Sequence, residues 1–497
     1  MPMVPAQQGP EAAIREYMII GGRPCPEGEG EPIPVYDPAR GVVIARQPEA
    51  GPRQVDKAVA AARRAFEDPA WRGLPPVARE KLLLDLADLV EKHGDELARL
   101  ETLNNGKLLA LSQGLEVGAG AQWLRYMAGW ATKISGETLN VSIPFPPGLD
   151  YHAYTRPEPV GVVGAIVPWN FPLLMAIWKI APAVATGCTV VLKPAEETPL
   201  TAIRLAELAL EAGFPPGVVN VITGRGEVTG AALVAHPGID KIAFTGSTEV
   251  GKLIGRQAMQ DMKRVSLELG GKSPVVILDD CDVDLAVQGA AAAIFFNQGQ
   301  VCTAGSRLFV QKGIYDKVVS GLASAASGMK LGPGMDPDTQ VGPLVSARHQ
   351  KRVLEYIDIG RQEGAQVLSG GAPGDGAGYF VRPTVFAGAP AGARISQEEI
   401  FGPVVVAAAF DTDDEAVALA NDTQFGLGAS IWSNNLTRVH RLIPRIQAGT
   451  VWVNTHNMLD PHMPFGGYKQ SGIGREHGRD AIEMYLHKKS VCVAYPG

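Results

Sequence analysis

Short β-rich runs alternate with helix-like stretches through the middle of the chain, and this alternation constrains the fold more than any other feature. The first set of runs covers residues 161–167, 189–192, 218–222, 241–244 and 265–269. A helical pattern at residues 201–212, closed by Gly213, falls between two of them. Such βαβ alternation predicts a parallel sheet with helices on both faces, which is the usual support for a dinucleotide.

The same alternation resumes in the second half of the chain. Further strand candidates lie at residues 275–278, 308–310, 366–368 and 404–409. A chain of 497 residues is also too long for one ordinary domain. We therefore predict a second α/β domain after the first.

The segments outside this alternating region have patterns of their own. Between residues 55 and 111 apolar side chains recur at helical spacing, which predicts two or more amphipathic helices. Residues 143–148 are rich in proline and predict an extended arm that leaves the body. Residues 488–494 predict a short strand, and residues 1–8, which lack the pattern of a secretory signal, predict a loose tail.

The composition is that of a globular protein, with 46% hydrophobic residues, 20% charged residues and a formal net charge of -7. Charges of both signs are scattered along the chain, so we expect no nucleic-acid partner. Residues 160–178 are almost uncharged, but Pro168, Asn170 and Pro172 interrupt them, which argues against a membrane span. The 5 cysteines are widely spaced without a Cys-x-x-Cys pair, which predicts a reducing cytoplasmic location and no metal site.

One cysteine lies in a segment suited to covalent chemistry. Cys302 is surrounded by Gly, Asn, Gln and Thr residues, whose N–H groups can stabilise a thiolate. Upstream in the chain, Glu268 offers a carboxylate that can activate water against an acylated sulfur. The two residues together suggest thioester chemistry, although a single cysteine taken alone is more often a packed core residue.

A glycine-containing run offers a possible phosphate site. Residues 246–252 fit the pattern Gly-x-x-x-x-Gly-Lys, but the next residue is Leu253, where a nucleotide triphosphatase needs a hydroxyl to hold magnesium. This mismatch disfavours an ATPase. A Gly246-Ser247 turn that opens a helix still offers backbone N–H groups to a pyrophosphate.

Several segments, taken together, resemble the NAD(P)-dependent aldehyde dehydrogenase superfamily over nearly the whole chain. In the family's order and roughly its spacing, they are Pro168-Trp169-Asn170-Phe171-Pro172, Leu192-Lys193-Pro194-Ala195-Glu196, Phe244-Thr245-Gly246-Ser247, Leu267-Glu268-Leu269-Gly270-Gly271-Lys272, Gly299-Gln300-Val301-Cys302, Glu399-Ile400-Phe401-Gly402-Pro403 and Pro464-Phe465-Gly466-Gly467. The resemblance implies an α/β fold in which a Rossmann-like cofactor domain joins an α/β catalytic domain and a small β oligomerisation arm.

The resemblance also implies a division of the chain. We expect a NAD-binding domain over residues 1–135 and 157–270, a catalytic domain over residues 271–474, and an oligomerisation region over residues 136–156 and 475–497. In the resembled family such an arm and terminal strand pair across subunits. A homotetramer or homodimer is therefore implied, although a strand that completes its own sheet remains an alternative.

A cofactor site follows from the same resemblance. Lys193 and Glu196 are expected at the adenine ribose, Gly246 and Ser247 at the pyrophosphate, Glu399 at the nicotinamide ribose and Phe401 beside the nicotinamide. Further members of this set are Ile166, Val167, Pro168, Trp169, Gly226, Phe244 and Leu269. The Glu196 carboxylate repels the 2′-phosphate of NADP while Lys193 partly offsets that repulsion, so NAD is the expected cofactor and use of NADP stays open.

The implied reaction is the oxidation of an aldehyde to a carboxylate. Cys302 is expected to attack the carbonyl, Asn170 and the Cys302 backbone N–H to stabilise the oxyanion, and Glu268 to activate the hydrolytic water. Lys179 and Glu476 match positions that contact or relay protons to this base in hydrolytic members of the family. Taken alone, each of these two charges would more often be a surface residue.

The implied substrate is a small aldehyde with an apolar group. Candidates for the wall of its tunnel are Phe171, Leu174, Met175, Trp178, Phe296, Val301, His456, Leu459 and Phe465. The loop at residues 454–461 looks most like that of phenylacetaldehyde-type members, which favours an arylacetaldehyde. Betaine aldehyde is the main alternative, because Trp178 and its neighbours can form a cation–π box, and a broad aliphatic specificity also stays open.

Other classes of protein explain these residues less well. A binding or structural protein on the same scaffold would not need Cys302, Glu268 and Asn170 together. A cysteine hydrolase would need a histidine base, and the nearest histidines, His236 and His349, are far from Cys302 in the chain.

Overall fold

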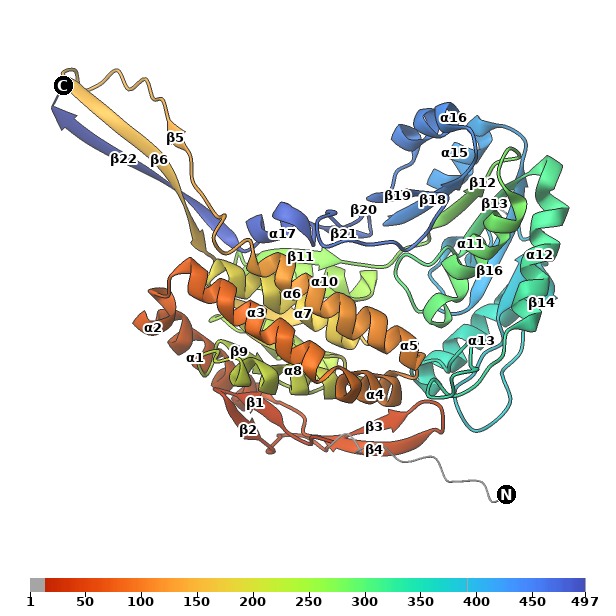
Figure 1. The fold of residues 1–497 in the computed structure, drawn as a ribbon, viewed down its shortest axis with the longest axis horizontal. Coiled ribbons are helices and arrows are strands. Elements are labelled where there is room, and N and C mark those ends of the chain that lie inside the picture. Colours follow the sequence, from red (N-terminus) through yellow and green to blue (C-terminus); the bar gives the residue numbers. More distant parts are fainter. Residues whose placement is uncertain (1–13, 391, 497) are drawn as a thin grey trace.

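The first of two large sheets has eight strands in the order β2-β1-β9-β8-β7-β10-β11-β21, and all of them except the blue β21 are coloured red to green in Figure 1. The computed structural model describes residues 14–390 and 392–496, so the tail expected at residues 1–8 lies outside the described residues. The strands are β1 (Met18–Ile20), β2 (Arg23–Cys25), β7 (Val162–Ile166), β8 (Thr189–Lys193), β9 (Val219–Val221), β10 (Lys241–Thr245), β11 (Arg264–Glu268) and β21 (Gly472–Ile473).

The centre of this sheet is parallel, as the βαβ pattern predicts. Strands β9, β8, β7, β10 and β11 pair in parallel, whereas β1 and β21 join antiparallel on either side. Every residue of β7 and β8 is buried, because helices cover both faces. These central strands confirm the runs predicted from the sequence, with small differences at their ends.

Helices cover the two faces of the first sheet unequally. The elements are α1 (Pro52–Glu67), α2 (Pro69–Arg72), α3 (Pro76–Lys92), α4 (Gly94–Asn105), α5 (Leu109–Leu111), the π-helix η1 (Ser112–Ala119), α6 (Gly120–Ala128), α7 (Pro172–Thr186), α8 (Leu200–Glu211), the π-helix η2 (Gly226–Gly230), α9 (Ala231–Ala235) and α10 (Thr248–Gln260). The core on one face is formed with α3, α6, α7 and α8, and the core on the other with α1, α9 and α10. The buried helix α7 and strand β7 account for the uncharged run at residues 160–178.

The second sheet has seven strands in the order β14-β15-β16-β13-β12-β18-β19 and confirms the second α/β unit. Its strands are β12 (Pro274–Ile277), β13 (Arg307–Gln311), β14 (Gln366–Ser369), β15 (Thr384–Ala387), β16 (Val404–Phe410), β18 (Gly428–Trp432) and β19 (Thr450–Val453). Its helices are α11 (Val283–Phe295), α12 (Tyr315–Gly328), α13 (Ala347–Gln362), α14 (Arg394–Gln397), α15 (Asp413–Asn421) and α16 (Leu436–Leu442), with short 3-10 turns η3 (Phe296–Gly299), η4 (Lys312–Ile314) and η5 (Ile443–Arg445). Only β14 pairs antiparallel within the described sheet.

A narrow three-stranded sheet projects from the body as an arm (Figure 1). Its strands are β5 (Thr138–Leu139), β6 (Leu149–Pro159) and β22 (Leu486–Pro496), and α17 (Gly478–Glu483) precedes β22. Strands β6 and β22 pair antiparallel along their whole length, from Pro159 opposite Leu486 to Leu149 opposite Pro496. The proline-rich residues 143–148 form the loop between β5 and β6, so they belong to the arm as the sequence predicts.

Some features were not predicted from the sequence. The hairpin of β3 (Ile33–Asp37) and β4 (Val42–Gln47) and the short pair β17 (Phe425–Gly426) and β20 (Tyr468–Lys469) have too few residues for a clear alternation. The domain boundaries stay a prediction. Strand β21 lies in the segment assigned to the catalytic domain but pairs with β11 of the first sheet. None of the helices in the described part of the chain is long and apolar enough to cross a membrane.

Candidate active site

A single large cavity brings together nearly all the residues predicted to act in catalysis. It measures about 1690 Å³, and Cys302, Glu268 and Asn170 line it. The cofactor candidates that line it are Ile166, Val167, Pro168, Trp169, Lys193, Glu196, Gly226, Phe244, Gly246, Ser247, Leu269, Glu399 and Phe401. The substrate candidates that line it are Phe171, Leu174, Met175, Trp178, Phe296, Val301, Leu459 and Phe465. His456, Lys179 and Glu476 lie outside its wall.

Cys302 lies in the loop between α11 and β13, which begins with an unusual turn. Asn297 and Gln298 have φ values of 47° and 57°, a left-handed conformation that side chains rarely adopt. Across the loop, a Cβ atom on Gly271 would lie 2.4 Å from the Cys302 carbonyl oxygen, so this approach requires glycine. The segment that follows β11 therefore packs directly against the backbone of the candidate nucleophile.

The environment of the Cys302 thiol favours its protonated form. Burial, together with the nearby carboxylates of Glu399 and Glu268, raises the pKa of Cys302 to about 12. Backbone N–H groups of Thr303 and Cys302 act in the opposite direction, as the polar sequence around the thiol predicts. Their effect is outweighed, so the pKa is raised overall, and the thiolate expected from the sequence to attack the carbonyl stays a prediction.

Glu268 ends strand β11 and lines the cavity. It is 4% exposed, and within the described residues neither of its carboxylate oxygens has a hydrogen-bond partner. Burial and the nearby Glu476 carboxylate raise the pKa of Glu268 well above its usual range, although Lys179 and Arg475 oppose that shift. A carboxyl group with a raised pKa and free oxygens has the properties of a general base for a bound water.

Lys179 and Glu476 form a buried ion pair behind Glu268. Lys179 Nζ lies 2.5 Å from Glu476 Oε1, and the two residues are 0% and 4% exposed. Lys179 comes from the middle of α7, whereas Glu476 is held by reciprocal backbone hydrogen bonds with Phe465. The electrostatic influence of both on the pKa of Glu268 places this pair next to the candidate base.

Asn170 occupies the turn between β7 and α7, and its side chain reaches the Cys302 loop. Its Nδ2 donates a hydrogen bond of 3.0 Å to the Gln300 carbonyl, and the residue is 4% exposed. A primary amide has two N–H donors, so one remains for a ligand. The Asn170 carbonyl accepts hydrogen bonds from Lys107 Nζ at 2.8 Å and Asn297 Nδ2 at 3.2 Å.

One end of the cavity has groups suited to a dinucleotide. Ser247 is the N-cap of α10, where its hydroxyl accepts from Val250, so the first-turn N–H groups of this helix face an anion site. Beside it, the Thr245 hydroxyl is buried and has no hydrogen-bond partner among the described residues. An unpartnered buried hydroxyl next to a helix N-terminus fits a bound polar ligand such as a dinucleotide.

The edge of β8 presents a cation and a carboxylate to the same end of the cavity. Lys193 Nζ lies 3.2 Å from Glu196 Oε2 and also donates to the Pro194 carbonyl at 3.1 Å. Lys193 is 2% exposed, whereas a quarter of the Glu196 side chain is exposed. Glu196 is thus the partner that a ribose can reach.

Glu399 and Phe401 lie between this end and Cys302. Glu399 Oε1 accepts from the Gly271 backbone N–H at 2.8 Å, and burial raises the pKa of Glu399 to about 7. Phe401 has a φ of 64° and packs edge-on against Trp169 at 5.2 Å. His349 holds this strained backbone, because its Nε2 lies 2.7 Å from the Phe401 carbonyl and its pKa is lowered to about 4 by burial. No motif around His349 predicts this role.

The other end of the cavity is aromatic and aliphatic. Phe171 and Phe296 stack with ring centroids 6.4 Å apart, and Trp178 meets Phe465 edge-on at 5.8 Å. Trp123, which the sequence reasoning missed, stacks on Trp178 at 5.8 Å. Other missed residues of this wall are Leu115, Ala119, Asn457 and Met458. The helical spacing of the run at residues 120–128 was the available signal for Trp123.

His456 is the substrate candidate that the structure corrects. It is 6% exposed and lies behind the Cys302 loop, with Nε2 at 2.8 Å from the Thr303 carbonyl and Nδ1 at 2.9 Å from Ser430 Oγ. Burial lowers the pKa of His456 to about 4, so the neutral ring donates to Thr303 and accepts from Ser430. Its neighbour Asn457 faces the cavity instead.

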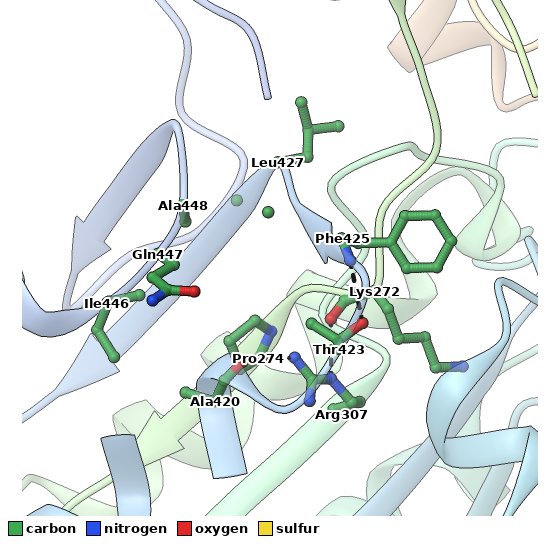
Figure 2. A pocket seen from close by; sticks show the side chains of 12 residues that line it. Lys272, Pro274, Arg307, Ala420, Thr423, Phe425, Leu427, Ile446, Gln447 and Ala448 are labelled. Atoms are coloured by element: carbon green, nitrogen blue, oxygen red, sulfur yellow. Dashed lines mark hydrogen bonds between the residues drawn. The ribbon is translucent and has the colours of Figure 1, made fainter. Parts of the chain in front are cut away.

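A second, much smaller cavity lies beside Arg307, where strands β12, β13 and β18 of the second sheet begin (Figure 2). Its volume of about 10 Å³ is close to the space for one water molecule. The Arg307 guanidinium donates to the carbonyls of Lys272, Leu419, Ala420 and Asp422. Figure 2 shows the Lys272 side chain pointing away from Ile446 and Ala448. These hydrogen bonds connect segments that are distant in the sequence, and we assign no ligand site to this cavity.

Comparison with known proteins agrees with this arrangement. The model of the aldehyde dehydrogenase family matches residues 26–491. A phenylacetaldehyde dehydrogenase of Pseudomonas fluorescens is 56% identical over 484 residues, which is 97% of this chain and 96% of the relative. The NAD+ complex of an aldehyde dehydrogenase from Bacillus cereus has a TM-score of 0.94 and 47% identity and covers 98% of this chain and 99% of its own.

A solved structure with a different named substrate is also similar. The betaine aldehyde dehydrogenase of Staphylococcus aureus in complex with NAD+ has a TM-score of 0.94 and 40% identity, over 97% of this chain and 95% of its own. The family model, the relatives and the solved structures all match over nearly the full described length. The chain therefore belongs to the aldehyde dehydrogenase family.

Proposed function

We propose that this protein oxidises an aldehyde to a carboxylate with NAD, through a thioester on Cys302 that a water activated by Glu268 hydrolyses. The observation that carries the proposal is the shared cavity, in which Cys302 lies between a polar end suited to a dinucleotide and an aromatic end. The similarity to a NAD+ complex of the family supports the choice of cofactor. When bound, the nicotinamide supplies the acceptor for the hydride that leaves the substrate carbon.

The chain's own residues account for the remaining steps. The Cys302 thiol gives its proton to the Glu268 carboxylate as its sulfur adds to the carbonyl carbon, and the oxyanion that forms is stabilised by the second Asn170 N–H and the Cys302 backbone N–H. After oxidation the acyl group stays on the sulfur. Glu268, which has meanwhile released that proton, takes a proton from water, whose oxygen attacks the thioester. The carbon–sulfur bond then breaks, the acid leaves, and the proton held by Glu268 returns to the Cys302 sulfur.

Lys179 and Glu476 give the Glu268 proton a route away from the cavity. The pair is buried directly behind the base, and the Glu476 carboxylate acts on the Glu268 pKa. Glu196, at the exposed side of the Lys193 pair, is placed to bind ribose hydroxyls and repel a 2′-phosphate. NAD is therefore the proposed cofactor, with NADP as a weaker one because Lys193 is adjacent.

An arylacetaldehyde such as phenylacetaldehyde is the proposed substrate. The stacked and edge-on rings of Phe171, Phe296 and Phe465 offer a planar apolar site for a ring, and the relative from Pseudomonas fluorescens bears this substrate in its name. Betaine aldehyde is the second candidate, because the stacked pair Trp123–Trp178 offers π-faces to a trimethylammonium group.

A panel of aldehydes tests the proposal. NADH and NADPH formation would be followed by absorbance with phenylacetaldehyde, acetaldehyde, betaine aldehyde and a carboxylated semialdehyde, and the acid product would be identified by chromatography. We expect the highest kcat/KM with phenylacetaldehyde and NAD. Formation of no acid from any member of the panel would refute the proposed reaction, whereas a best rate with betaine aldehyde would refute only the substrate.

A further inference from the structure

A buried ion pair lies directly outside the cavity wall, beside the turn that carries Asn170. Lys107 and Glu116 are 1% and 0% exposed, and Lys107 Nζ donates a hydrogen bond to Glu116 Oε1. Burying two charges is costly, and their attraction offsets this cost only where further hydrogen bonds satisfy both groups. The further hydrogen bond of Lys107 ends on the turn between β7 and α7, and that of Glu116 ends on the first turn of α7.

Lys107 holds the end of the turn between β7 and α7. Its Nζ donates to the Asn170 carbonyl at 2.8 Å and lies 4.5 Å from the centre of the Phe171 ring. The carbonyl carbon and the side chain of Asn170 are bonded to the same Cα atom. Holding the carbonyl therefore restricts the direction in which the Asn170 amide points toward the Cys302 loop.

Glu116 holds the first turn of α7. Its Oε2 accepts a hydrogen bond of 2.8 Å from the Leu174 backbone N–H, in the first turn of α7. N–H groups of a first turn have no partner inside the helix, and the N-cap residue Phe171 supplies no side-chain cap. A carboxylate at this point also suits the positive end of the helix. The Glu116 contact thus sets where α7 begins and where its cavity-facing residues lie.

Unusual backbone conformations direct the side chains of Lys107 and Glu116 into the protein interior. Gly106 ends α4 with a φ of 89°, and a Cβ atom there would lie 2.6 Å from Pro343 Cγ, so this turn into Lys107 needs glycine. Glu116 belongs to the π-helix η1, a form that often marks functional sites. Glu101 Oε1 is 3.7 Å from Lys107 Nζ, and burial together with the nearby Glu116 carboxylate raises the pKa of Glu101 to about 8.

We propose that Lys107 and Glu116 are positioning residues that hold the Asn170 amide and the first turn of α7 in the geometry that oxyanion stabilisation needs. The inference rests on the proposed role of Asn170 and extends it to residues that do not touch the cavity. Because an oxyanion exists only during the reaction, the loss of this pair should lower kcat and leave the KM for NAD unchanged.

A double-mutant cycle tests this coupling. The variants are Lys107→Met, Asn170→Ala and both together, with kcat and KM measured for the aldehyde and NAD and Tm measured for each. We expect Lys107→Met to lower kcat by about 10-fold or more, because small misplacements near the reacting atoms have large effects. In the Asn170→Ala background the same change should lower kcat no further, since the group through which Lys107 acts is absent.

Lys263→Met is the matched control. Lys263 is also buried, at 3% exposure, but its Nζ donates to the carbonyls of Val234 and His236, away from Asn170. Its loss should leave kcat within about twofold of wild type. If Lys107→Met fails to fold, Lys107→Met with Glu116→Gln removes both charges and keeps an oxygen for the Leu174 N–H. This pair variant should fold and show the same loss of kcat.

Two results would overturn the inference alone. One is that Lys107→Met lowers kcat by the same factor in the wild-type and in the Asn170→Ala background. The other is that the variant with Lys107→Met and Glu116→Gln folds and has the kcat of wild type. An unchanged kcat in Asn170→Ala would instead overturn the role of Asn170 and the inference that depends on it.

Discussion

The buried Cys302 thiol has a raised pKa, because burial and, to a smaller extent, the Glu399 and Glu268 carboxylates disfavour the thiolate. We expect Cys302→Ala to abolish NADH formation and to leave NAD binding intact, because the sulfur carries the acyl group and makes no required cofactor contact. Absorbance at the NADH band and isothermal titration with NAD measure the two properties. Cys492→Ala, at an exposed position of the arm, is the control that keeps full activity. Substantial turnover in Cys302→Ala would remove the thioester from the reaction.

The raised pKa of Glu268 predicts a pH dependence. A general base acts in its deprotonated form, so steady-state activity should rise with pH as Glu268 loses its proton above the usual carboxyl range. Glu268→Gln should lose this dependence and lower steady-state turnover by about 10²–10⁴. Stopped-flow measurements should still show rapid NADH release in the first turnover. A variant with an unchanged steady state would mean that another group activates the water.

Glu196 should control the choice between NAD and NADP. Glu196→Gln removes a negative charge at the proposed 2′ position while Lys193 remains, so kcat/KM for NADP should rise relative to NAD. Kinetics with both cofactors give the ratio directly. Glu227→Gln, at an exposed position of η2 outside the cavity wall, should leave the ratio unchanged. The same ratio in Glu196→Gln and wild type would show that Glu196 does not face the ribose.

The sequence predicted site residues best where a motif surrounds them. Cys302, Glu268 and Asn170 all reach one cavity, as their motifs suggest, although their roles stay predictions. His456 was misplaced because a sequence does not show which way an imidazole turns, and here Ser430 and Thr303 hold it inside. Lys107 and Glu116 could not be found, since their significance depends on backbone groups distant in the chain.

At the scale of elements, the arm formed by β5, β6 and β22 exposes apolar side chains, as expected of a surface that binds another chain. Val493 and Tyr495 are 48% and 47% exposed on β22, and Phe145 is 79% exposed in the neighbouring loop. We expect Val493→Asp with Tyr495→Asp to shift the protein to a smaller assembly, because charges would replace apolar contact area. Sedimentation velocity measures this change.

The control for the arm variant is Val42→Asp, at an equally exposed apolar position on β4 in the body. It should leave the sedimentation coefficient unchanged. Equal sedimentation of the arm variant and wild type would mean that β22 completes only its own sheet, which is the alternative that the sequence left open.

Elements of the two large sheets were predicted well because buried parallel strands are continuous apolar runs. Strands β7, β8 and β10 match their predicted runs for this reason. The hairpin of β1 and β2 was missed, since β2 is three residues long, includes a proline and is largely exposed. The π-helices η1 and η2 were also missed, because their extra residue per turn leaves no periodic signal in so few residues.

For the whole molecule, substrate preference depends on a wall assembled from both α/β units. Burying a phenyl ring removes about 100 Å² or more from water at roughly 25 cal/mol per Å², which exceeds the 1.4 kcal/mol that corresponds to about tenfold. We therefore expect kcat/KM for phenylacetaldehyde to exceed that for acetaldehyde by about tenfold or more. Phe465→Ala should reduce this preference more than it reduces activity on acetaldehyde. A preference for betaine aldehyde would mean that the aromatic wall binds a cationic group.

The pairing of β6 with β22 affects the protein while it is being made. The two strands are neighbours in space but are separated by most of the chain, so β6 leaves the ribosome long before its partner exists. At typical translation rates the delay is on the order of tens of seconds. During that time one edge of β6 is open to other nascent chains. Its Asp150, Arg156 and Glu158 and its two prolines are the features that keep such an edge from aggregating until β22 arrives.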